Sequence, residues 1–131
     1  FFKIGMGLRV IAIFRKSDAD TNASTFTIKF GKFDSIGSDI MCTEATTSTH
    51  TGKEIKMDTQ FTFTALGAAG TGKVLANSLG SNTGGGEVGS VLDRSSQLDT
   101  TAIQYLVFTA QCSANGSAVH ELLSVWVELI G

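Results

Sequence analysis

Proline is absent from the 131 residues, and cysteine occurs only at Cys42 and Cys112. Without proline, the turns must be made by glycine, serine, asparagine and aspartate. The cysteines lie about seventy residues apart, and neither they nor His50 and His120 have zinc-ligand spacing, so we expect no metal site there. The cysteines are either two small, half-buried apolar residues or a disulfide, and the sequence leaves both interpretations open.

Charge is also scarce, at 17% of residues, with a net charge of −2 and no cluster of either sign. A nucleic-acid surface needs a basic stripe, so we expect no nucleic-acid partner. No segment has the length of a membrane span, so membrane insertion is not expected. The chain opens with Phe1 and not with methionine, which suggests a fragment, a processed product or part of a longer protein.

Apolar residues make up 42% of the chain and include nine phenylalanines, which exclude general disorder. The length fits a single domain over residues 1–131. Apolar and polar residues alternate in short runs separated by turn residues, which indicates an antiparallel all-β sandwich or barrel. The sixth run, in "EVGSVLDRSSQLD", is also compatible with a short helix. The expected strands are 7–16, 24–33, 38–46, 53–66, 72–80, 86–92, 102–112 and 121–130.

Two glycine-rich stretches imitate nucleotide-binding motifs. "GAAGTGKV" (67–74) has phosphate-loop spacing, but Val74 replaces the hydroxyl residue that should reach Mg²⁺, and no helix pattern follows. "GGGEVG" (84–89) has dinucleotide-fingerprint spacing without a surrounding βαβ unit. We therefore expect turns between antiparallel strands, and no cofactor.

No nucleophile motif or triad pattern appears, so we expect neither catalytic residues nor enzymatic activity. "SDADTN" places Asp18, Asp20 and Asn22 as an EF-hand loop does, but Ala23 and Lys29 stand where Gly and Glu are required. A looser Ca²⁺ site and a plain Asx-rich turn are the two remaining interpretations of this loop. The acidic residues are expected to be solvated surface charges, namely Glu54, Asp58, Glu87, Asp93 and Glu121.

Three of the expected strands, 7–16, 102–112 and 121–130, are apolar on both faces. We expect them to share one sheet, whose outer face would leave a large apolar patch on a monomer. Self-association would bury that face, and coverage by loops is the alternative. The expected trimer interface consists of Ile11, Ile13, Tyr105, Val107, Trp126 and Ile130.

Several stretches together resemble a known family. They are "GLRVIAIFRKSDADTNASTFTIKFG", "IKMDTQFTFTALGAAGTGKVLANS", "LDTTAIQYLVFTAQCSANGS" and "ELLSVWVELIG". In this order they are similar to the repeating β-domain of tailed-phage appendage proteins, which occurs in tail-fibre knobs, head fibres and capsid-decorating proteins. The resemblance implies an eight-stranded jelly-roll sandwich that forms homotrimers on the virion surface.

The expected function is therefore that of a virion structural protein whose loops contact other virion proteins of the capsid or tail, or a host surface glycan or protein. The contact loops would be 17–23, 47–52, 67–72, 80–86 and 113–119. A carbohydrate-binding module and a small glycan-degrading domain are alternatives, as is a cement protein that recognises nothing outside the particle. A single Trp and a single Tyr weaken the sugar-binding alternative, because sugar platforms usually need exposed aromatic rings.

Overall fold

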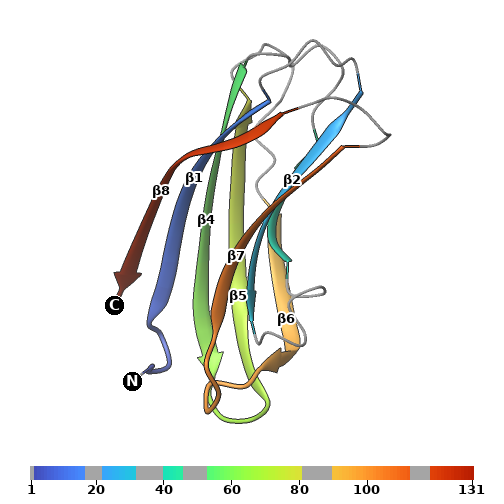
Figure 1. Cartoon of the computed structure of the whole chain (residues 1–131). Helices are drawn as coiled ribbons and strands as arrows, with labels where there is room; N and C mark the ends of the chain where they lie inside the picture. Colours follow the sequence, from blue (N-terminus) through green and yellow to red (C-terminus); the bar gives the residue numbers. More distant parts are fainter. Residues whose placement is uncertain (1, 17–21, 32–39, 46–52, 81–89, 113–118) are drawn as a thin grey trace.

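A computed structural model of the chain describes residues 2–16, 22–31, 40–45, 53–80, 90–112 and 119–131 (Figure 1). These residues form antiparallel β-strands, and no helix occurs among them. The all-β fold class expected from the alternation is therefore confirmed for the described part of the chain. The strands are β1 (Gly7–Lys16), β2 (Ser24–Gly31), β3 (Ile40–Ala45), β4 (Lys53–Ala65), β5 (Gly70–Gly80), β6 (Ser90–Leu98), β7 (Tyr105–Cys112) and β8 (His120–Ile130).

The strands form two sheets. The larger sheet has the order β6-β5-β4-β1-β8, and the smaller sheet has the order β3-β2-β7. Figure 1 shows β8 at one edge of the larger sheet, beside β1, with β2 and β7 in the layer that faces it. Two pairings, β1 with β8 and β2 with β7, join the beginning of the chain to its end.

Strand β1 has the bounds that the alternation predicted, whereas two later strands differ from their expected bounds by three residues or more. The sixth strand was expected at 86–92 and is found at Ser90–Leu98, which also excludes the short helix there. The seventh begins at Tyr105 and not at residue 102, because Asp99 starts a turn. The Asp99 carboxylate accepts hydrogen bonds from the backbone N–H and the hydroxyl of Thr101, and its carbonyl accepts one from Ala102 N–H. The "LDTTA" stretch therefore forms a side-chain-capped turn before the strand.

The expectation that β1, β7 and β8 share one sheet is wrong. β1 and β8 are neighbours in the larger sheet, but β7 pairs with β2 in the smaller one, where Ile28 lies opposite Phe108. Alternation shows which residues of one strand share a face. It does not show which strands are neighbours, and that is where the expectation failed.

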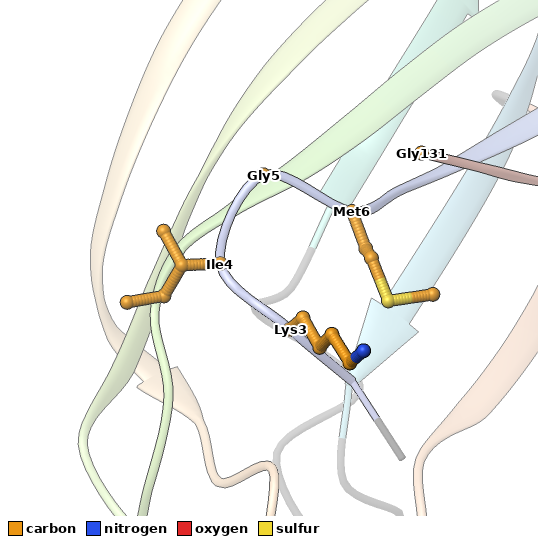
Figure 2. Close-up of a pocket in the computed structure, with 5 residues that line it drawn as sticks. All are labelled: Lys3, Ile4, Gly5, Met6 and Gly131. Carbon is orange, nitrogen blue, oxygen red and sulfur yellow. The ribbon is translucent and has the colours of Figure 1, made fainter.

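The two ends of the chain lie together at one end of the larger sheet. Residues 3–6 form a turn in which Met6 N–H donates to Lys3 carbonyl at 3.0 Å and Gly5 N–H donates to Phe63 carbonyl at 2.9 Å. Gly5 has a φ of 87°, in the region that favours glycine. This turn and Gly131 line an open hollow, in which Lys3 is the charged side chain and Ile4 points away from Met6 (Figure 2). Backbone, one ammonium and one thioether do not form a recognisable catalytic set.

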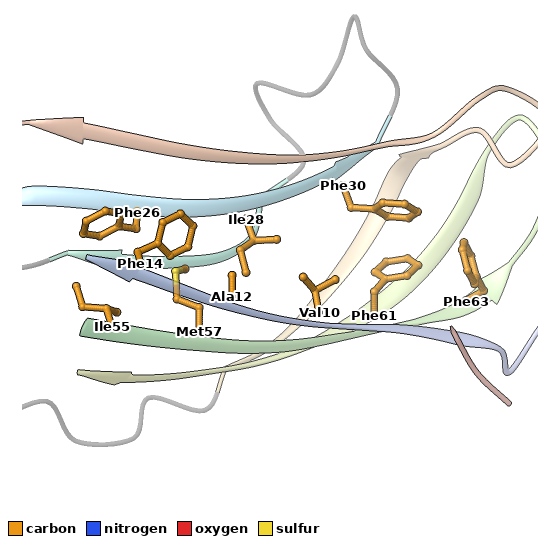
Figure 3. Close-up of a cluster of buried hydrophobic side chains, with 10 residues drawn as sticks. All are labelled: Val10, Ala12, Phe14, Phe26, Ile28, Phe30, Ile55, Met57, Phe61 and Phe63. Atoms are coloured by element: carbon orange, nitrogen blue, oxygen red, sulfur yellow. The ribbon is translucent and has the colours of Figure 1, made fainter. Parts of the chain in front are cut away.

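The core lies between β2 and the pair β1 and β4, and Figure 3 shows its side chains pointing into that space. Phenylalanine rings dominate it: Phe14 and Phe26 have centroids 4.9 Å apart, and those of Phe30 and Phe61 are 5.6 Å apart. The Phe61 ring lies directly over Gly72 of β5, where an added Cβ would come within 1.9 Å of the ring. The core comprises Val10, Ala12, Phe14, Phe26, Ile28, Phe30, Ile55, Met57, Phe61 and Phe63.

Candidate interaction surface

Strand β8 exposes apolar side chains along most of its length. Trp126 is 64% exposed and Val127 is 49% exposed, although they point to opposite faces of the sheet. An edge strand that is apolar on both faces is a ready template for association. The large exposed apolar residues of β8 are Leu122, Leu123, Val125, Trp126, Val127 and Leu129.

The register with β1 shows which of these side chains face the core. Val127 lies directly opposite Val10, and Val125 lies opposite Ala12. Directly opposed residues of antiparallel strands point to the same face, and both Val10 and Ala12 are fully buried. Val125, Val127 and Leu129 therefore point to the core side of the larger sheet, yet each is between 40% and 49% exposed.

The core side is open here because the smaller sheet does not extend over β8. The ring contact at 6.3 Å between Phe14 of β1 and Phe108 of β7 places β7 over β1. Leu106 and Phe108 of β7 pack against the core but are only partly buried. We call this region the open side, defined by Val125, Val127 and Leu129 of β8 together with Leu106 and Phe108 of β7.

The outer face of the same sheet is mixed in character. Arg9 of β1 donates two hydrogen bonds to the Asp58 carboxylate of β4, at 3.0 and 2.7 Å. Arg15 of β1 donates one to Glu121 of β8 at 2.7 Å. The hydrogen bond from Arg9 is the main reason that the pKa of Asp58 lies below its ordinary value, and the charge of Arg9 adds to it while burial opposes it. The same hydrogen bonds raise the pKa of Arg9 and of Arg15.

The structure divides the expected trimer interface between two sheets. Ile11, Ile13, Trp126 and Ile130 lie on β1 and β8, and Trp126 is directly opposite Ile11. Tyr105 and Val107 lie on β7 in the smaller sheet. The exposed inner residues of β8 were not predicted as a contact surface, because their face was expected to lie in the core. The sequence feature that could have predicted this contact surface is that β8 is apolar on both faces and contains no Lys or Pro, residues that commonly protect an edge strand.

His120 and Ser24 form the contact that most resembles catalytic machinery. His120 Nε2 lies 2.8 Å from Ser24 Oγ, and its ring meets the edge of Phe26 with centroids 5.5 Å apart. Ser24, however, is only 1% exposed, so a substrate cannot reach its hydroxyl. Beside it, Lys16 is fully buried and its Nζ donates to the carbonyl of Asn22. These polar groups hold the ends of β1, β2 and β8 together.

The glycine-rich stretch that imitates a phosphate loop lies in an antiparallel hairpin. β4 pairs with β5 across it, which confirms the expected turn between two strands. Gly67, with a φ of 110°, donates its N–H to the Thr100 hydroxyl at 2.8 Å and accepts a hydrogen bond from Thr100 N–H at 3.0 Å. The hairpin is thus joined to the turn that precedes β7.

Several expected features lie partly or wholly outside the described residues. These include Asp18 and Asp20 of the calcium loop, most of the contact loops, and the side chains of Glu87 and Asp93.

Cys112 is a thiol and not half of a disulfide. Cys42 of β3 lies opposite Ile28 of β2, and Cys112 of β7 lies opposite Ser24 of β2. The two cysteines are thus on opposite sides of β2, and the distance between their backbones is too long for a disulfide. No group of three potential metal ligands occurs among the residues that the structure describes, and no helix there could cross a membrane.

Comparison with known proteins adds no relative: no protein-family model, curated protein or solved structure matches the chain.

Proposed function

We propose that this chain is a non-enzymatic structural protein of the virion exterior, which forms a homotrimer and presents its loops to the host surface or to neighbouring virion proteins. The sequence stretches that resemble phage appendage domains support this proposal through where they lie. They include β1 and β2, the β4–β5 hairpin, the Asp99 turn with β7, and β8. These stretches build the framework of the fold, as expected of a structural protein.

The observation that carries the trimer is the exposed apolar surface of β8. Six large apolar side chains on one edge strand are each at least 40% exposed. Exposed apolar side chains concentrated on one strand, here divided between its two faces, often mark a contact site. Closed symmetry would bury the strand and prevent the open filaments that an exposed edge invites.

The finer fold that we propose is a jelly roll. The nested pairings of β1 with β8 and of β2 with β7 support it, since a jelly roll wraps a long antiparallel hairpin in this way. Two features depart from a regular jelly roll. β3 pairs with β2 and β6 pairs with β5, so β3 and β6 are not neighbours, and β1 pairs with β4 inside the larger sheet. An experimental structure that fixes the neighbours of β3, β4 and β6 tests the jelly-roll topology.

Sedimentation and binding measurements on the purified chain test the proposed function. At micromolar concentration the chain should sediment as a trimer, and it should bind host cells or bare capsids. Preferential binding to host cells indicates receptor recognition, whereas binding to capsids alone indicates a cement role. A folded monomer that binds neither, or hydrolysis of polysaccharide abolished by one carboxylate substitution, would contradict the proposal.

Carbohydrate binding is the second candidate, and one observation favours it. Trp126 is 64% exposed and Tyr105 is 41% exposed, so both rings are accessible on strand surfaces. Trp126 is the single tryptophan of the chain, so its fluorescence reports directly on a ligand that stacks on it. Saturable quenching by a glycan, absent in Trp126→Ala, would favour this candidate.

A further inference from the structure

We infer that copies of this chain meet through the open side and not through the outer face of the larger sheet. The inference rests on the homotrimer of the proposed function and names its contact surface. The occupant to which it commits is a neighbouring copy of the same chain.

The two faces that meet at β8 differ in their chemistry. The open side carries Val125, Val127 and Leu129, which continue the row of the buried Val10 and Ala12. The outer face carries the Arg9–Asp58 and Arg15–Glu121 ion pairs around Ile11 and Ile13. Burying those charges would remove their water, a penalty that their mutual attraction offsets only in part. Burying the open side meets no such penalty.

The edge strands of the two sheets also differ in charge. β8 ends the strand order of the larger sheet, and β7 ends that of the smaller sheet on the same flank. β8 carries the acidic residues Glu121 and Glu128, whereas β7, "YLVFTAQC", has no charged residue. Glu121 and Glu128 lie opposite Arg15 and Arg9, so both belong to the outer face, and a contact through the open side brings no charge of β8 against the uncharged β7 of the next copy. This head-to-tail contact is the kind that a threefold ring requires.

The contact also needs enough apolar area. On the open side, the half-exposed Val125, Val127 and Leu129 of β8 present on the order of 200 Å² of apolar surface. A stable interface contributes roughly 800 Å² from each partner, so β8 supplies about a quarter, and β7 with the strand edges has to supply the rest. A lone peptide strand added to β8 would leave Leu106 and Phe108 uncovered, whereas another copy of the domain covers both strands. The small net charge of −2 opposes such self-association only weakly.

Two neighbouring residues of β8 allow a matched test. Val127 lies on the open side and Trp126 on the outer face, and both are exposed, so an Asp at either position should leave the subunit folded. We expect Val127→Asp to weaken the trimer by on the order of 100-fold or more, because a carboxylate would be buried without a partner. Trp126→Asp should change trimer affinity only a few-fold. The assay is sedimentation over a dilution series, with far-ultraviolet circular dichroism to confirm the fold.

The outcomes separate this inference from the proposed function. If Trp126→Asp dissociates a native trimer and Val127→Asp does not, the outer face is the contact and the inference is wrong while the trimer remains. A native trimer that resists both substitutions also overturns the inference, whereas a folded native monomer or dimer contradicts the trimer itself. Leu129→Gln is a milder change on the open side, and it must weaken the trimer if Val127→Asp fails to fold.

Discussion

Val10 and Val127 are the same residue type, lie opposite each other on neighbouring strands and point to the same face. Val10 is fully buried, yet Val127 is 49% exposed. The difference arises from what lies above each residue: β2 and β7 cover β1, and among the described strands nothing comparable covers β8. One sheet thus has a covered part, formed by β1 and β4, which holds the subunit together and which we call the closed flank. Its other part, the face of β8 on the open side, is available for another copy.

The closed flank is stabilised by ring packing. Phe61 contacts Phe30 and Phe63, with centroids 5.6 and 4.9 Å away, and it lies against the backbone of Gly72. A ring with neighbours on every side gains both apolar burial and dispersion contacts. The side chains of β8 on the open side lack a layer above them, so they contribute less to the stability of an isolated subunit.

The largest expected effect breaks the closed flank. Phe61→Ala should lower the free energy of unfolding by about 3–5 kcal/mol, because it removes a buried ring and leaves a cavity beside Phe30 and Phe63. Urea unfolding followed by circular dichroism measures the loss. A loss below about 1 kcal/mol would mean that the Phe61 site collapses or is not tightly packed.

Alanine substitutions at Val10 and Val127 give a smaller effect but a better matched test of how the two sites differ in coverage. Val10→Ala should lower the unfolding free energy by about 2 kcal/mol, and Val127→Ala by less than about 1 kcal/mol in the monomer, because Val127 is already half exposed. The two substitutions remove the same atoms from facing positions.

Protein concentration distinguishes the two sites further. If Val127 lies in a contact between copies, the effect of Val127→Ala on the thermal midpoint should depend on concentration, while that of Val10→Ala should not. Equal losses for both substitutions at every concentration would show that β8 is covered within the subunit.

The all-β class was predictable from the sequence because alternation is a local property. "GLRVIAIFRK" predicts β1 from its own residues, and the antiparallel hairpin at Gly67 follows from the strand pattern of β4 and the lack of a helix after it. The turn at Asp99 was missed because a side-chain cap competes with a strand pattern that runs on through Ile103. Strand neighbours and coverage are non-local, so the placement of β7 and the exposure of Val127 were beyond single-sequence reasoning.

The smallest expected effect lies on the outer face of the closed flank, where Arg9 of β1 pairs with Asp58 of β4. Replacing the carboxylate in Asp58→Asn should lower stability at pH 7 by no more than about 1 kcal/mol, since the Asp58 and Arg9 side chains are 21% and 41% exposed and water screens the pair.

The pH dependence of this effect identifies its source. The pKa of Asp58 is lowered in the folded protein, so its stabilising contribution is present above the ordinary aspartate pKa of about 4 and is lost as the pH falls through the folded value. The difference between the native chain and Asp58→Asn should therefore be largest near neutrality and vanish in strong acid. Added salt near 1 M should reduce it at pH 7. A difference that stays constant from pH 7 to strong acid would instead assign the effect to packing, and a double-mutant cycle with Arg9→Gln would then show no coupling between the two side chains.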